Sequence, residues 1–160
     1  MQRSGSEIEF CIQTMKQSRN GQAAILSSQD LDNLIAALPA GPHRVLATIL
    51  RFSASRVSES RQLRWRHVTK DWLIYPAEIT KTKETRSIPM SPQLFTVLTE
   101  WKTQQGGGPD DFICPGRFGE AITRQAFDKA FRRACTQCGV KGASSHSFRR
   151  TQLTLSLIHI

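Results

Sequence analysis

Three short groups of polar residues, far apart in the sequence, have the types and spacings to act together on a phosphate. They are Arg56 with Glu59, Lys81 alone, and His146 with Arg149. Guanidinium groups donate paired, planar hydrogen bonds that fit the non-bridging oxygens of a phosphodiester. Lysine and histidine side chains can transfer the protons that its cleavage requires. This combination of residues indicates chemistry on a phosphodiester.

The patterns between these groups predict a mainly α-helical domain with a small antiparallel β-hairpin. Apolar residues recur at helical spacing, and turn residues separate the helices. Around residues 71–90 the pattern becomes that of two strands on either side of a polar tip. The predicted helices cover residues 27–38, 42–52, 57–65, 91–104, 123–138 and 148–154, and the predicted strands cover 71–79 and 85–90.

The charge of the chain suits a polyanionic partner. Lysine and arginine number 22 against 13 acidic residues, for a formal net charge of +9. Nucleic acid is the commonest partner of such a chain, although membrane-surface proteins and many enzymes are also basic. The basic residues gather in residues 51–70 and 124–150, each with a single acidic residue. These two clusters could form one patch, or they could be two solvated helix faces.

The ordered set of motifs resembles the catalytic domain of the tyrosine recombinases, the phage integrase family. In that family an Arg-x-x-Glu precedes a Leu-x-Trp, a β-hairpin carries a lysine eight residues before a proline in a context such as Lys-Thr-x-x-x-Arg-x-x-Pro, and a long basic helix leads to His-x-x-Arg. The resemblance extends from Leu26 to about Thr154. The matching residues are Arg56-Val57-Ser58-Glu59, Leu63-Arg64-Trp65, Lys81 with Pro89, and His146-Ser147-Phe148-Arg149.

The resemblance implies a role for each polar residue. Arg56 and Arg149 would clamp the scissile phosphate and stabilise the charge of the transition state. Lys81 would protonate the leaving 5′ oxygen, and His146 would assist proton transfer at the attacking oxygen. Glu59 would orient the active-site groups and temper their positive charge. Neither a cofactor nor a metal ion is expected.

Some of these residues also have a simpler interpretation. Arg56 could be a surface arginine paired with Glu59, and His146 could lie near a helix N-terminus without any chemical role. Lys83 competes with Lys81, because a strand would point both side chains the same way. Only the spacing to the following proline favours Lys81.

The cysteine pattern does not indicate a metal or redox site. Cys135 and Cys138 have the spacing of a metal-binding or redox pair, but they lie in a strong helical pattern without a second pair of ligands. Core packing is the favoured interpretation. No apolar run approaches the length of a membrane span. The expected location is the cytoplasm, in a bacterial or phage-encoded, nucleoid-associated protein.

The nucleophilic tyrosine of the family is missing from its usual place. The family places it a few tens of residues after His-x-x-Arg, whereas eleven residues follow Arg149 and none is tyrosine. Tyr75, the only tyrosine, lies on the first predicted strand, where a packing role is expected. We therefore expect a linker or N-terminal remnant (residues 1–25), a partial recombinase catalytic domain (26–154), incomplete at its C-terminus, and an anomalous tail (155–160).

The leading functional hypothesis is a fragment of a site-specific recombinase or integrase. By family, such enzymes cleave and rejoin double-stranded DNA through a phosphotyrosine intermediate, as homo-oligomers on the DNA. This fragment is expected to bind DNA without cleaving it. The alternative is a non-catalytic DNA-binding protein with the same fold, and the motif set disfavours a basic RNA-binding domain.

Overall fold

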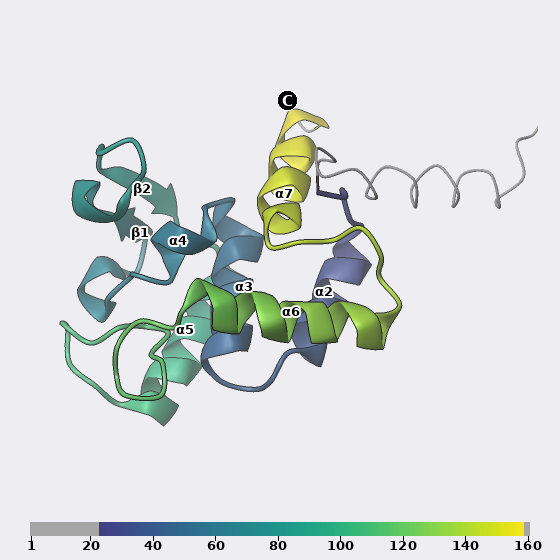
Figure 1. Ribbon diagram of the computed structural model, residues 1–160. Coiled ribbons are helices and arrows are strands. Elements are labelled where there is room, and N and C mark those ends of the chain that lie inside the picture. Colours follow the sequence, from purple (N-terminus) through teal and green to yellow (C-terminus); the bar gives the residue numbers. More distant parts are fainter. Residues whose placement is uncertain (1–22, 159–160) are drawn as a thin grey trace, which may run out of the picture.

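Helix α3 is the element around which the others pack in the computed structural model, which describes residues 23–158. Side chains from Val45 to Leu50 are all buried, because α2, α5 and α7 cover different sides of the helix (Figure 1). The helix is nonetheless amphipathic, since His43, Arg44 and Arg51 are only partly buried. The helices are α2 (Ser28–Ala37), α3 (Pro42–Ser53), α4 (Val57–Ser60), α5 (Pro92–Gln105), α6 (Arg124–Cys138) and α7 (His146–Ile158).

A two-stranded antiparallel sheet lies beside the helices, as the sequence predicts. Its strands are β1 (Trp72–Tyr75) and β2 (Arg86–Pro89), and short 3-10 turns η1 (Trp65–His67) and η2 (Ala77–Ile79) precede and follow β1. Leu73 and Tyr75 are buried, whereas their neighbour Trp72 is exposed. This alternation joins one face of the sheet to the helical core.

Side-chain caps fix where several helices begin. Hydroxyl oxygens accept hydrogen bonds from backbone N–H groups three residues ahead, at Ser27, Ser91 and Thr123. Gly139 follows α6 with a φ of 67°, a left-handed conformation that glycine adopts without steric cost. The predicted starts of these helices, and the end of α6, are therefore confirmed.

The predicted helix over residues 57–65 is wrong in its second half. Helix α4 ends at Ser60, and the chain then turns and pairs with the segment before α6. The N–H of Ile113 donates to the carbonyl of Leu63, and the N–H of Trp65 donates to the carbonyl of Asp111. These backbone partners lie almost fifty residues further along the chain, so local periodicity could not reveal them.

The first predicted strand is too long. Strand β1 ends at Tyr75, and residues 77–79 form η2. Pro76 has no N–H to donate to a neighbouring strand, so it ends the ladder at this point. The predicted second strand is close to the observed β2.

Helix α7 joins the beginning of the described chain to the core. The N–H of Leu26 donates to the hydroxyl of Thr151 at 2.9 Å, and Arg150 donates to the carbonyl of Ala23 at 2.9 Å. The helix continues to Ile158, into the expected tail. The rest of that tail and residues 1–22 of the expected linker lie outside the described residues. Within residues 23–158 no helix is long and apolar enough to span a membrane.

Phe148 tests whether the packing of α7 stabilises the fold. Its ring is fully buried and lies 5.4 Å from that of Phe131 on α6. Because a large cavity would replace the ring, Phe148→Ala should lower the free energy of unfolding by about 3–5 kcal/mol in urea titrations. Phe118→Ala, at a side chain that is 86% exposed, is the control and should change it by less than about 0.5 kcal/mol. Equal effects of the two changes would contradict this packing.

Candidate active site

The turn between α3 and α4 places Arg56 at the start of the site. Ala54 has a φ of 53°, a left-handed conformation that is unusual for a residue with a side chain. This turn reverses the chain after α3, so that Arg56 is the N-cap of the short helix α4. In the described chain the other non-glycine residue with positive φ is Lys83, beside the predicted catalytic lysine. Such conformations cluster at functional sites.

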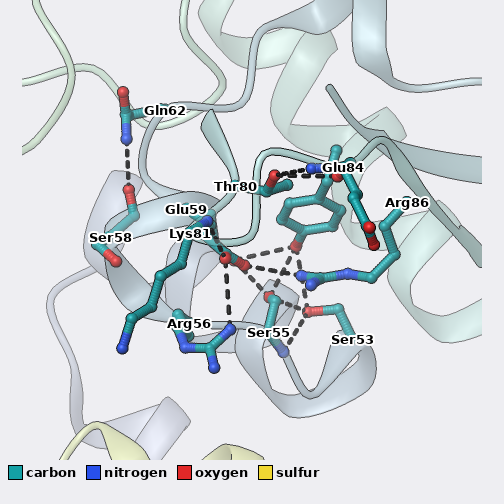
Figure 2. Close-up of polar contacts among 12 residues, drawn as sticks. Ser53, Ser55, Arg56, Ser58, Glu59, Gln62, Thr80, Lys81, Glu84 and Arg86 are labelled. Atoms are coloured by element: carbon teal, nitrogen blue, oxygen red, sulfur yellow. Dashed lines mark hydrogen bonds and ion pairs between the residues drawn. The ribbon is translucent and has the colours of Figure 1, made fainter. Parts of the chain in front are cut away.

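Glu59 is the hub of the site. It is 1% exposed, and its carboxylate accepts hydrogen bonds from three directions (Figure 2). Nη2 of Arg86 donates to Oε2 at 2.8 Å, and the backbone N–H of Lys81 donates to Oε1 at 3.0 Å. Nη1 of Arg56 lies 3.5 Å from Oε1. One carboxylate thus connects α4, the turn between the strands, and β2.

The predicted catalytic lysine lies in a turn rather than a strand. Thr80 closes this turn, since its hydroxyl donates to the carbonyl of Glu84 and accepts from the N–H of Glu84. Lys81 and Lys83 do not lie in a strand, so the expectation that their side chains point the same way does not apply. Only Lys81 has its backbone bound to Glu59, and Figure 2 shows its side chain extending along Arg56.

A cluster of buried hydroxyl groups lies behind the site. The phenol oxygen of Tyr75 lies 2.8 Å from Oγ of Ser55 and 3.0 Å from Oγ of Ser60. Ser53 completes the cluster at the end of α3. These serines flank the turn that carries Arg56 and Glu59, so the hydrogen bonds fasten that turn to β1. Burial raises the pKa of Tyr75, against the effect of these hydrogen bonds.

Arg149 reaches the same site from α7. Partial burial lowers its pKa, and the positive charges of Arg56 and Arg86 lower it further, whereas the carboxylate of Glu59 raises it. Electrostatic effects of this kind require the three guanidinium groups to be near one another. The site therefore combines Arg56, Arg86 and the Lys81 backbone around one carboxylate, with Arg149 near enough for these charges to act on it, and its net positive charge favours an anion.

His146 lies one helical turn before Arg149 and faces a neighbouring cavity. It is exposed and lines a cavity of about 290 Å³ with Arg124 and Arg132 of α6 and Ser144. The spacing of three residues puts His146 and Arg149 on the same side of α7. The structure thus brings four predicted site residues together at Glu59 and places the fifth beside them.

Arg86 belongs to the site but was not among the predicted site residues. Burial alone would raise the pKa of Glu59, but the Lys81 N–H, Arg86 and Arg56 together hold it below its usual range. The arginine of the hairpin motif, five residues after Lys81, was the available signal. The sequence could not show that this side chain turns toward Glu59 rather than toward solvent.

The cysteines pack as expected. Cys135 is buried in the apolar core and Cys138 is partly buried against it. Nowhere in the described part of the chain do three His, Cys, Asp or Glu side chains gather as metal ligands would.

Residues 24–156 match the phage integrase family. The chain belongs to this family. Tyrosine recombinase XerC of Xanthomonas axonopodis pv. citri is 28% identical over 109 residues, which are 68% of this chain and 35% of that protein. XerC of Xylella fastidiosa strain 9a5c is also 28% identical over 109 residues, or 37% of its length. The chain therefore spans about a third of the length of these relatives.

Solved structures of this family share the fold. XerA recombinase matches with a TM-score of 0.72 at 15% identity, over 89% of this chain and 52% of the XerA chain. The catalytic core of lambda integrase matches with a TM-score of 0.69 at 17% identity, over 87% of this chain and 85% of the integrase chain. The predicted tyrosine recombinase catalytic-domain fold is confirmed.

The depressed pKa of Glu59 predicts how acid affects stability. Because the folded pKa lies below the unfolded value of about 4.3, the ionised carboxylate stabilises the fold above that pH, and this contribution is lost as pH falls through the folded pKa. Glu59→Gln should therefore reduce the free energy of unfolding at pH 7, and the deficit should shrink by pH 3. Urea titrations at pH 7 and pH 3 measure this deficit in the free energy of unfolding. Glu100→Gln, at an exposed carboxylate, is the control; a deficit that is independent of pH would contradict the role of the charge.

Proposed function

We propose that this chain is part of the catalytic domain of a DNA site-specific recombinase. We also propose that it binds duplex DNA, with a backbone phosphate held by the arginines around Glu59. The observation that carries the proposal is the contact of Arg56 and Arg86 with a single buried carboxylate, and Arg149 of the predicted motif is near enough for these charges to act on it. Guanidinium groups in this number suit the oxygens of a phosphodiester. The relatives named as tyrosine recombinases support the same assignment.

Each residue has a task in the proposed reaction. Arg56 and Arg149 hold the two non-bridging oxygens and stabilise the charge that develops on them. Lys81 delivers a proton to the leaving 5′ oxygen, and His146 handles the proton of the attacking hydroxyl. Glu59 keeps the cationic groups in place, so the phosphate meets an arrangement that is already formed.

The surface around His146 extends the proposed DNA contact. Arg124 and Arg132 belong to α6 and line the same cavity as His146. Basic side chains beside the phosphate site would bind neighbouring phosphates of one duplex. A lambda integrase dimer bound to a COC′ core site and a lambda integrase tetramer bound to a Holliday junction have been solved. By analogy, we propose homo-oligomers on DNA for the complete protein.

The 160-residue chain is proposed to bind DNA without cleaving it. The family reaction uses a tyrosine as the attacking group, and Tyr75 is the only tyrosine of this sequence. Its side chain is fully buried and hydrogen-bonded to serines, and burial raises its pKa. A nucleophile must reach the phosphate and lose its proton, and Tyr75 is unsuited to both. A non-catalytic DNA-binding role is therefore the second candidate for this chain.

DNA affinity tests the phosphate site. Binding to duplex DNA should be roughly micromolar or weaker at physiological salt and should weaken steeply as salt rises, because phosphate contacts release counterions. Arg56→Gln and Arg149→Gln should each weaken binding and reduce the slope of log K against log salt by about one.

Fluorescence anisotropy over a salt series measures both the DNA affinity and the slope of log K against log salt. The control is Arg66→Gln, which removes the same charge from an exposed ion pair with Asp110 and should leave the slope nearly unchanged. Binding that does not depend on salt would contradict the proposal, as would a preference for structured RNA over duplex DNA.

Covalent chemistry is tested on the same chain. Incubation with labelled duplex DNA should yield no protein–DNA adduct on denaturing gels, at any ionic strength, because no accessible tyrosine is available for attack. Tyr75→Phe should leave that result unchanged. An adduct that forms with the unaltered chain and disappears in Tyr75→Phe would show that Tyr75 is the nucleophile.

A further inference from the structure

Arg86 occupies a special place in the hairpin. It lies opposite Tyr75 in the β1–β2 register, and its guanidinium group lies 4.9 Å from the centre of the tyrosine ring. From there Nη2 reaches Oε2 of Glu59 at 2.8 Å. The side chain is 35% exposed, so it spans from the core to the surface of the site.

We propose that Arg86 is a positioning residue of the phosphate site, which holds Glu59 so that Arg56 stays available for the phosphate. The proposal rests on the function proposed above, because it assumes that Arg56 binds a phosphate. Arg86 itself is not assigned a contact with the DNA. Arg86 acts on Arg56 through the carboxylate of Glu59.

The distances around Glu59 support this division of tasks. A buried carboxylate requires a charged partner close by, since desolvation is costly. Arg86 provides the short contact, at 2.8 Å, whereas Arg56 lies at 3.5 Å, beyond the usual length of a charge-assisted hydrogen bond. Arg86, on β2, therefore balances most of the negative charge of Glu59. The donors of Arg56 are left largely uncommitted.

The two carboxylate oxygens have separate partners. Oε2 is bound to Arg86, and Oε1 accepts from the backbone N–H of Lys81. Fixing Oε2 sets the rotation of the carboxylate and hence the direction of Oε1. Arg86 thereby also positions the turn that carries Lys81. Without Arg86, Glu59 would turn toward Arg56, its nearest remaining cation, and pull that side chain away from the phosphate.

The support for Arg86 comes from the core. The ring of Tyr75 lies under the guanidinium group, and the phenol oxygen is fixed by Ser55 and Ser60. A cation over an aromatic face is attracted to it, and more strongly where water is excluded. The chain of contacts from the serines through Tyr75 and Arg86 ends at Glu59.

Nuclear magnetic resonance on the 160-residue chain tests the proposal. The readouts are the titration of the Glu59 carboxyl and the hydrogen exchange of the Lys81 amide. Arg86→Gln should raise the pKa of Glu59, because the carboxylate then keeps only Arg56 and Arg149 as cationic neighbours, beside the Lys81 N–H. It should also accelerate exchange of the Lys81 amide by about tenfold, the loss expected for one hydrogen bond. Arg86→Lys keeps a charge but lacks the planar guanidinium group that spans from Tyr75 to Glu59, so it should show both changes to a smaller extent.

Arg66→Gln is the matched control, because it removes an exposed arginine from an ion pair elsewhere and should change neither readout. Unchanged titration and exchange in Arg86→Gln would overturn the proposal. Should Arg86→Gln fail to fold, Arg86→Lys decides. A raised pKa of Glu59 in Arg86→Lys supports the proposal, and an unchanged pKa overturns it.

DNA affinity then shows whether the positioning matters for Arg56. Arg56→Gln should weaken DNA binding less in the Arg86→Gln background than in the unaltered chain, because Arg56 is already drawn to Glu59. Equal losses in the two backgrounds would overturn this part of the proposal. Absence of DNA binding by the unaltered chain would overturn the proposed function instead, while the two spectroscopic readouts would still decide whether Arg86 positions Glu59.

Discussion

The buried carboxylate of Glu59 is the interaction on which the rest of the site depends. An anion site needs several positive groups close together, and such groups repel one another. Burial is the main cause of the lowered pKa of Arg149, and the positive charges of Arg56 and Arg86 lower it further. A single carboxylate at the centre offsets part of that cost without filling the site, because its 1% exposure keeps it beneath the surface. The remaining positive charge is left for a ligand.

If the site binds DNA as proposed, this arrangement lets it be formed before the DNA arrives. Preorganised charges stabilise a developing anion most when they need no rearrangement at the moment of reaction. Here the rearrangement is prevented by backbone as well as side-chain contacts: the N–H of Lys81 bonds to Glu59, and the hydroxyl of Thr80 closes the turn around Glu84. The main chain of Lys81 is therefore connected to the arginines through Glu59, while its side chain remains exposed.

The sequence predicted the parts of the molecule that depend on local signals. Caps, apolar periodicity and turn residues located most helices and both strands, and the ordered motifs indicated the family. It failed at Leu63–Trp65, because those residues pair with a segment almost fifty residues away, and at Pro76, where a missing donor outweighed a strand-like pattern. Arg86 was missed for a similar reason: its motif position was visible, but its bond to Glu59 depends on how β2 lies against α4. Local patterns do not contain that relation between elements.

The polar core behind the site also accounts for the position of the only tyrosine. A turn with a left-handed alanine is costly, and it persists only where the surrounding contacts determine it. Ser53 and Ser55 lie on either side of Ala54 and both bond to the phenol of Tyr75. An apolar side chain at this position would fill the space but remove the phenol, and the buried serine hydroxyls would then have only one another as partners. The phenol of Tyr75 therefore fastens the turn that carries Arg56 to β1.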